Sequence, residues 1–494
     1  MSGPRYRWSG AACVGVSLAL GAGVIWYPVA TAAAVSGAFA IVVGLWCGSR
    51  LPKFFLATLG ILLIGYAFLG RGFAYLGVPP LFVGEMVLAV GFLTAAVNGG
   101  MSSALRSPMA WMLMAFGVWG AVRTIPYWGV YGLDALRDGV VWGYGVFALL
   151  VASFLLRCGW LSRVPERYRR WLPWLLVWIP VGIVTQRLAG DGLPRIPGAD
   201  VELLAMKPGD AAVHLGGAAV FLLLGLHQVS GRPSEAPSSL REWVWWTAWL
   251  AGFLIVATGN RGGLLAVLMA VLVVLSIRPF SKWGKVVLIG GVLTAVFFAL
   301  NLEIDLRETS RKVSPQQILL NLQSIAGSDS SESLESTKDW RLNWWNHIVD
   351  YTVFGEYFWT GKGFGINLAD DDGFQVGTGQ SLRSPHNGHL TILARAGVPG
   401  LVLWVLSQGA FAVSLLRAYL RARRAGREWW ARIDLWILSY WTAFMVNAAF
   451  DVFLEGPQGG IWFWSVMGFG LAALEEQRRQ QHQYFTGFAP SDSL

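Results

Sequence analysis

The sequence predicts an all-α polytopic membrane protein with about 12–14 transmembrane helices and one large, mainly helical extracytoplasmic loop. Hydrophobic residues make up 55% of the 494-residue chain and charged residues only 14%, whereas soluble domains carry about 25% charged residues. The apolar residues also gather in runs near the roughly 20 residues that a helix needs to cross a bilayer. These runs lie at about residues 9–27, 29–48, 54–70, 80–98, 108–122, 139–156, 171–186, 211–229, 243–258, 263–277, 286–300, 391–416, 433–450 and 461–474.

Lysine and arginine are distributed unevenly over the segments between these runs. If the N-terminus lies in the cytoplasm and the helices alternate, most of the 38 basic residues fall in cytoplasmic segments, as the positive-inside rule requires. The largest cytoplasmic groups lie at residues 157–170 and 417–432. The net charge of +9 follows from this bias and does not indicate nucleic acid binding.

The N-terminal segment resembles a signal sequence, because Arg5 and Arg7 precede an apolar run. It lacks a convincing small-residue cleavage site and a second apolar run follows, so we expect a retained first helix. The three cysteines, Cys13, Cys47 and Cys158, lie in or at the end of apolar runs. The large loop therefore has neither a disulfide framework nor a cysteine-based zinc site.

We expect four parts along the chain. Transmembrane helices occupy residues 1–300, an extracytoplasmic catalytic loop spans 301–390, C-terminal transmembrane helices span 391–475, and a cytoplasmic tail covers 476–494. A loop of about 90 residues between membrane helices is too long for a simple connector and is typical of a functional element.

Two helices are expected within this loop. One begins near Ser314, where a capping serine precedes a proline, and runs to about Ile325. The other runs from Thr337 or Asp339 to about Phe354. Between them, a stretch rich in serine and glycine indicates a flexible break.

Arg261 is the first candidate for chemistry. It lies in the turn Thr258-Gly259-Asn260-Arg261-Gly262-Gly263, between two apolar runs. A charge at membrane depth is costly and indicates a functional site, although an arginine can also extend its charged end to the lipid headgroups. The flanking glycines favour a ligand, because they allow its close approach to the backbone.

Arg341 is the second candidate and lies on the expected second loop helix. Arg341 and Trp345 are four residues apart and therefore share a helix face. A guanidinium can bind phosphate oxygens with two parallel hydrogen bonds. The alternative is a solvated arginine that stacks on an aromatic helix.

His386 is the third candidate, at the point where the loop re-enters the membrane. A histidine is the natural general base near neutral pH, although a single loop histidine is often only solvated. Asn387 and His389 cluster with it, which favours a site. We therefore predict His386 as a catalytic residue and Asn387, His389 and Trp345 as substrate-binding residues.

Other polar patterns have simpler explanations. The run Asp370–Asp372 could bind a divalent cation but is more typical of a solvated acidic turn. The turn with glycines at 361, 363 and 365 follows no clear strand, so a nucleotide fingerprint is not expected. His214 and His227 lie within an apolar run and are consistent with packed core. We predict no metal site.

A group of polar residues between two earlier runs faces the same outer side. These residues either bind sugar, with Arg123 and Arg137 as the candidates, or form an interfacial amphipathic segment with ordinary ion pairs. The group comprises Arg123, Tyr127, Trp128, Asp134, Arg137 and Asp138.

The ordered motifs resemble the O-antigen ligase/polymerase superfamily. They are the Arg-Gly turn within 258–262, the R-x-x-x-W helix at 341–345, the H-N-x-x-L motif at 386–390 and the G-x-P-G-L motif at 397–401. The resemblance covers roughly residues 240–475. The superfamily includes lipopolysaccharide O-antigen ligases, Wzy-type polysaccharide polymerases and O-linked protein oligosaccharyltransferases.

The resemblance implies a metal-independent, inverting glycosyltransferase with a GT-C-type membrane fold and no cofactor. Its donor would be a glycan linked to a polyprenyl diphosphate such as undecaprenyl diphosphate, and its site would face the periplasm from the bacterial inner membrane. By this resemblance Arg261 and Arg341 hold the diphosphate, His386 deprotonates the acceptor hydroxyl, and Asn387 orients His386 or the acceptor. Arg395 departs from the acidic or neutral residue of the family pattern, which leaves its role open.

Simple physical chemistry agrees with this assignment. A diphosphate leaves readily only if its developing charge is neutralised, and two arginines can do so without a metal. A positioned base accelerates attack by a hydroxyl by about 10²–10⁴-fold. The lipid tail of the donor needs a groove between helices, which a membrane protein can supply.

Several functions remain open at this stage. An O-antigen ligase uses a lipid A–core glycolipid as acceptor, a polymerase uses a second lipid-linked repeat, and a protein acceptor is also open. The rival from another class is a flippase for lipid-linked oligosaccharides. A flippase would place several charges along a central cavity and have short loops, whereas these apolar runs are nearly free of charge. A purely structural protein would not need Arg261 in a membrane turn.

Overall fold

The computed structural model describes residues 50–199, 201–228, 239–278, 291, 314–326, 332–376 and 382–485. The expected runs at 9–27, 29–48 and 286–300 lie outside the described residues, as do Cys13 and Cys47. Every other expected run is helical, as predicted. These helices are α3 (Leu51–Leu69), α5 (Val83–Val97), α6 (Pro108–Thr124), α8 (Leu133–Gly143), α9 (Gly145–Cys158), α10 (Arg163–Ala189), α11 (Pro208–Leu223), α12 (Ser239–Gly259), α13 (Arg261–Ile277), α18 (Gly388–Arg424), α19 (Glu428–Ala448) and α20 (Pro457–Phe485).

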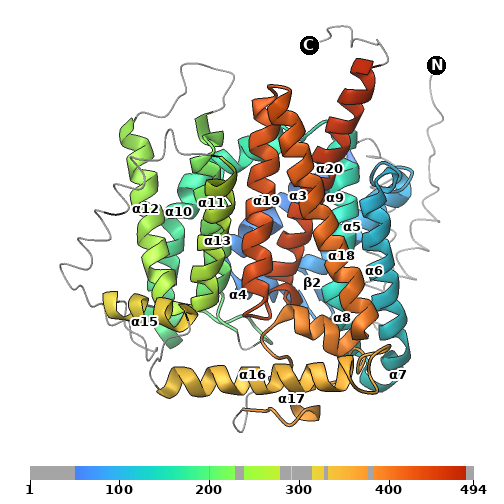
Figure 1. Ribbon diagram of the computed structural model, residues 1–494, viewed down its shortest axis with the longest axis vertical. Helices are drawn as coiled ribbons and strands as arrows, with labels where there is room; N and C mark the ends of the chain where they lie inside the picture. The colour runs from blue at the N-terminus through green and yellow to red at the C-terminus, as the bar shows by residue number, and fades with distance from the viewer. Residues whose placement is uncertain are drawn as a thin grey trace, which may run out of the picture.

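The helices form a bundle in which most of the long helices lie side by side (Figure 1). Among the described residues, α3, α10 and α18 are each long and apolar enough to cross a membrane. The pair α8 and α9, bent by 45°, forms a possible fourth span, and α5, α11 and α13 are shorter apolar helices. The protein is therefore multi-pass, while the count of 12–14 helices and the GT-C type remain predictions.

Short elements join the long helices. Residues 77–82 form a small antiparallel hairpin of β1 (Gly77–Val78) and β2 (Leu81–Phe82). Several of the described connections contain a helical turn. These turns are α4 (Arg71–Ala74), η1 (Ala104–Arg106), η2 (Ile125–Tyr127), α7 (Trp128–Tyr131), η3 (Gly190–Gly192), η4 (Leu226–Gln228), α17 (Leu368–Asp371) and η6 (Phe453–Glu455).

Two helices of the expected loop are present and lie across the ends of the bundle helices (Figure 1). The first, α15 (Pro315–Ala326), begins as predicted after Ser314, whose hydroxyl accepts a hydrogen bond from the Gln317 amide at 3.2 Å. The second, α16 (Glu332–Val353), begins earlier than expected. The helix continues through Leu334 and Glu335, good helix formers that follow the serine-rich stretch.

Close approach of helices in the centre of the bundle depends on small residues of α11. A Cβ on Gly216 would lie 3.4 Å from Ala443 Cβ of α19, and a Cβ on Gly217 would lie 2.7 Å from the Tyr440 ring. Small residues are the usual contact points of membrane helices, because they let backbones approach. Through these contacts α11 packs closely against α19.

The long helix α18 is broken at Gly397. This residue has φ +69° and ψ −174°, which no helix contains. A Cβ here would lie 2.6 Å from the carbonyl oxygen of Phe358, and the Val398 amide donates to that oxygen at 2.8 Å. The short segment before Gly397 is thereby attached to the connection that follows α16.

Candidate active site

The turn that follows α19 contacts Arg341, His386 and Gly262, the residue next to Arg261. Arg341 Nη1 of α16 donates to the Phe450 carbonyl oxygen at 3.3 Å. Gly262, next to Arg261, packs so closely on Phe450 that a Cβ would lie 2.6 Å from the Phe450 Cβ. His386 Nδ1 lies 3.8 Å from Oδ1 of Asp451. We call residues 449–452 the hub turn.

Three helix N-termini surround the hub turn. Arg261 is the first residue of α13, and the side-chain oxygen of Asn260 caps this helix by accepting from the Gly263 amide at 2.7 Å. Lys207 precedes α11 and lies 3.8 Å from Asp451, and α18 begins at Gly388, two residues after His386. Helix N-termini carry partial positive charge and unpaired N–H groups, so their convergence favours a bound anion.

The surrounding chain fixes the position of His386. Its backbone has φ +53°, a left-handed conformation that is uncommon for a residue other than glycine. On one side, the Trp345 indole N–H donates to the Pro385 carbonyl at 2.9 Å. On the other side, Asn387 Oδ1 caps α18 by accepting from the His389 and Leu390 amides at 3.1 and 3.2 Å. Trp345 and Asn387 therefore act by positioning His386.

Asp451 is a site residue that the sequence reasoning missed. Burial favours its protonated form, but the interaction with His386, the charge of Lys207 and the Val452 amide outweigh burial and lower its pKa to about 2. Asp451 is thus a carboxylate that faces two basic groups. It follows directly on the apolar run 433–450, so the membrane-depth argument that selected Arg261 would also have selected Asp451.

Both ring nitrogens of His389 have partners within the protein. Its Nδ1 accepts from the Trp404 indole N–H at 3.1 Å, and its Nε2 lies 3.1 Å from the Met445 carbonyl oxygen. Because Nδ1 is the acceptor, Nε2 carries the proton and donates to Met445. His389 thus joins α18 to α19, and its role in substrate binding stays a prediction.

Comparison with protein families agrees with this geometry. Residues 246–405 match the model of a family described as O-antigen ligase. This part of the chain is similar to the O-antigen ligase family. No curated protein matches the chain. The predicted resemblance to the O-antigen ligase/polymerase superfamily is confirmed.

The range that matches the family contains part of the candidate site, and residues outside that range supply the rest. Arg261, Arg341 and His386 lie inside the matched range, whereas Lys207 precedes it and Asp451 follows it. The charged partner of His386 therefore comes from the chain beyond the matched domain.

Arg395, whose role was left open by the sequence, forms a buried ion pair with Asp138. Arg395 is 1% exposed, and its Nη1 lies 2.9 Å from Oδ2 of Asp138 in α8. The same Asp138 oxygen accepts from Arg383 Nη2 at 3.0 Å and from the Gly365 amide at 3.0 Å. This cluster joins α8, the glycine-rich turn and α18, so Arg395 and Asp138 have a structural role.

The two arginines predicted to bind sugar have local partners. Arg123 Nε donates to the Thr360 carbonyl at 2.7 Å, and its Nη2 donates to the Tyr127 hydroxyl at 3.3 Å. Arg137 forms a solvent-exposed pair with Asp134 at 3.8 Å. Arg123 therefore contacts the connection that follows α16, and sugar binding by Arg123 and Arg137 stays a prediction.

The acidic run at 370–372 and the glycine-rich turn at 361–365 are joined by ion pairs. Lys362 forms ion pairs with Asp371 and Asp372, and the Trp344 indole N–H donates to Asp372 at 2.6 Å. The three glycines of the turn have positive φ, and a Cβ on Gly363 would overlap the Tyr127 ring at 2.1 Å. The carboxylates thus fix α16 to the turn, and the glycines permit close packing.

The two histidines of the earlier apolar run are packed inside the protein. His214 Nδ1 lies 2.7 Å from the Tyr440 hydroxyl, and its ring packs edge-on against Trp462. His227 is 1% exposed and lies 3.5 Å from Glu242. Both agree with the core reading.

Proposed function

We propose that the protein is an inverting glycosyltransferase that moves a polyprenyl-diphosphate-linked glycan to an acceptor hydroxyl. One observation carries the proposal: the hub turn contacts Arg341, His386 and the residue next to Arg261, so two predicted cations and one base come from segments that meet at one end of the helix bundle. A membrane domain of the O-antigen ligase family supports lipid-linked glycan substrates. Its reaction needs no metal, because two arginines can carry the charge of the leaving diphosphate.

The geometry at His386 suits a general base. With Nδ1–H directed toward Asp451, the lone pair of Nε2 is available for the proton of the acceptor hydroxyl. The carboxylate then stabilises the imidazolium that forms, as Asp451 is already ionised. His386 remains 31% exposed at its side chain, so an acceptor can reach it.

One displacement then completes the transfer. The acceptor oxygen attacks the anomeric carbon on the face opposite the diphosphate, and the bond between that carbon and the diphosphate oxygen breaks. The proton passes to His386, and the released polyprenyl diphosphate keeps the electron pair. Arg261 and Arg341, together with the N-terminus of α13, hold the developing negative charge. A single attack of this kind inverts the anomeric configuration.

The distribution of charge supports a site on the outer face of the inner membrane. Arg278, at the other end of α13, pairs with Glu428 at 2.8 Å, and Arg423 donates to the Ile277 carbonyl at 3.4 Å. The basic segments thus meet at the end opposite the hub turn. By the positive-inside rule that end lies in the cytoplasm, and the hub turn faces the periplasm.

The acceptor decides between ligase and polymerase, and the family placement favours neither. The test is a transfer assay with purified protein, a polyprenyl-diphosphate oligosaccharide and EDTA. A lipid A–core glycolipid and the donor itself are offered separately as acceptors. Single transfer to the glycolipid identifies a ligase, and a ladder from donor alone identifies a polymerase. A folded sample that forms no product with either acceptor counts against the proposal.

A further inference from the structure

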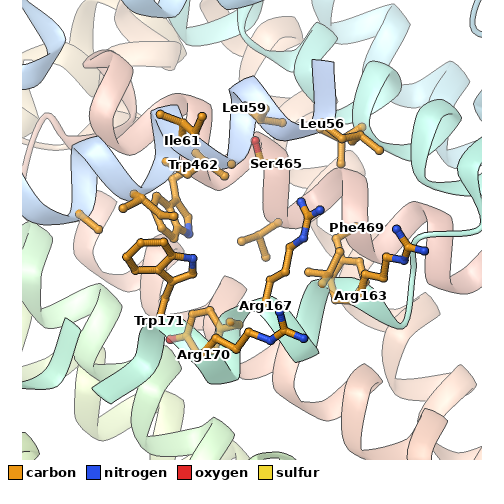
Figure 2. Close-up of a pocket in the computed structure, with 18 of the residues that line it drawn as sticks. Leu56, Leu59, Ile61, Arg163, Arg167, Arg170, Trp171, Trp462, Ser465 and Phe469 are labelled. Carbon is orange, nitrogen blue, oxygen red and sulfur yellow. The ribbon is translucent and has the colours of Figure 1, made fainter. Parts of the chain in front are cut away.

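An apolar groove lies apart from the site, between α3, α9, α10, α19 and α20. Its volume is about 730 Å³, within the roughly 300–1,000 Å³ of typical ligand pockets. Its walls are mainly aliphatic and aromatic, and Figure 2 shows Leu59 and Ile61 of α3 opposite Trp171 of α10. None of the residues around the hub turn lines this groove.

Three arginines border the groove along the first turns of α10. Arg163, Arg167 and Arg170 lie together on one side of the space in Figure 2. The guanidinium carbons of Arg163 and Arg167 lie 4.9 and 4.7 Å from the ring centre of Trp160, so one indole supports two cations. Arg170 also pairs with Glu166, the acidic residue of the same helix turn. The cluster therefore carries a net positive charge.

The cluster belongs to the basic end of the protein. At the other end of α10, Arg187 Nη2 lies 3.2 Å from the position of a Cβ on Gly259, two residues before Arg261. The beginning of α10 is thus at the end opposite the hub turn. The groove consequently opens toward the lipid leaflet on the basic side, away from the glycan-transfer site.

We propose that this groove binds one anionic phospholipid from the leaflet on the basic side. The apolar walls take the acyl chains, and Arg163, Arg167 and Arg170 take the phosphate and the negatively charged headgroup. Guanidinium groups match phosphate oxygens in geometry and charge, and basic pockets between membrane helices are known to select anionic lipids. A free phosphate would use only the arginines and leave the apolar walls unoccupied.

Retention of lipid by the full-length protein in detergent tests this proposal. Phosphatidylglycerol and phosphatidylcholine with identical chains are added in turn, and bound lipid is counted by native mass spectrometry. Wild type is expected to retain phosphatidylglycerol over phosphatidylcholine by about tenfold, because each basic group near a headgroup favours the anion. The variant R163Q/R167Q/R170Q is expected to lose this preference.

The matched control is R417Q/R421Q/R424Q, which removes three exposed arginines of α18 at the same end of the protein. This control should keep the preference for phosphatidylglycerol. An equal loss of preference in both variants would mean that the surface charge of this end selects the lipid, and it would contradict a specific groove. Retained preference in R163Q/R167Q/R170Q overturns the proposal. Displacement of the lipid by inorganic phosphate alone also overturns it, because a free-anion site would then explain the binding.

A second variant tests the apolar part independently. Gly60 lines the groove, and a Cβ there would meet no heavy atom within 4 Å, so Gly60→Phe fills the space without a clash at the backbone. We expect lower retention of both lipids. Gly117→Phe on α6, where the surroundings are equally open, is the control and should retain both. Unchanged retention in Gly60→Phe means that something other than lipid covers the groove and contradicts the proposal.

Discussion

The Nδ1 atom of His386 lies 3.8 Å from Oδ1 of Asp451, and Lys207 Nζ lies 3.8 Å from the same oxygen. One carboxylate at the hub turn therefore serves two basic side chains that come from segments far apart in the sequence. The arrangement orients His386 and keeps Asp451 ionised.

Replacing Asp451 with asparagine should lower stability in a pH-dependent way. The native pKa of about 2 lies below the ordinary value of about 3.9, so the carboxylate stabilises the fold above about pH 4. This contribution disappears as the pH falls toward 2. We expect Asp451→Asn to lose about 1–2 kcal/mol at pH 7, to lose about half as much at pH 3, and to approach wild type only near pH 2. Thermal unfolding followed by tryptophan fluorescence checks this, and a difference that does not change with pH would contradict it.

Replacing Trp345 with phenylalanine should slow glycan transfer while donor binding persists. The substitution removes the indole N–H that holds the Pro385 carbonyl next to His386. A hydrogen bond contributes a net free energy of about 1 kcal/mol. If its loss raises the barrier to transfer by that amount, kcat falls roughly fivefold with little change in KM. Trp340→Phe is the control, since the Trp340 ring packs against Trp344 and Phe374 on another face of α16. An equal loss of kcat in the two variants would show that aromatic packing, and not the hydrogen bond to Pro385, causes the effect.

Breaking the buried pair between Asp138 and Arg395 should destabilise the protein strongly. Arg395 and Asp138 are 1% and 8% exposed, so Asp138→Asn leaves a buried guanidinium without its carboxylate. Loss of one partner of a buried pair costs about 3–5 kcal/mol. The double variant Asp138→Asn/Arg395→Met should recover part of this loss. A double variant whose unfolding loss equals the sum of the two single losses would show that the residues act independently.

Two glycines of α18 should respond in opposite ways to alanine. Gly397 has a positive φ and no room for a Cβ, so Gly397→Ala should lower stability by about 1–3 kcal/mol or more. At Gly409 a Cβ meets nothing within 4 Å, so Gly409→Ala should be neutral or stabilising by up to about 1 kcal/mol. Melting temperatures of both variants in the same detergent check this. An equal drop in melting temperature for Gly409→Ala would contradict the conclusion that the conformation of Gly397 causes the loss of stability.

The helices could be predicted from the sequence because each apolar run is local information. Arg261 and His386 could be selected as candidates for the same reason, because they lie beside apolar runs in short polar motifs, and their catalytic roles stay predictions. Both loop helices could be predicted, but α16 begins at Glu332 and not at Thr337 or Asp339. The serine-rich stretch before it is typical of a flexible break, so its last residues do not look helical in the sequence. Local pattern therefore recovers elements and candidate residues better than their boundaries.

Partnerships across the sequence could not be predicted in this way. Arg395 looked anomalous until the fold placed Asp138 beside it, and the contacts of His389 with Trp404 and Met445 could be seen only in the fold. The acidic run at 370–372 was expected to be a solvated turn, but Asp372 is buried and paired with Lys362 and Trp344, and these partners could not be read from the sequence. Tertiary contacts decide which charged residues serve structure and which remain for substrate.

Single-turnover glycan transfer by His386→Ala, Arg261→Ala and Arg341→Ala tests the central claim most directly. The claim predicts that His386→Ala binds the polyprenyl-diphosphate donor normally but transfers about 10²–10⁴-fold more slowly, because only the base is lost. The two arginine variants should lose both donor binding and transfer, whereas Arg417→Ala at the opposite end should match wild type. Transfer at the wild-type rate by His386→Ala and Arg261→Ala would contradict a catalytic site at the hub turn.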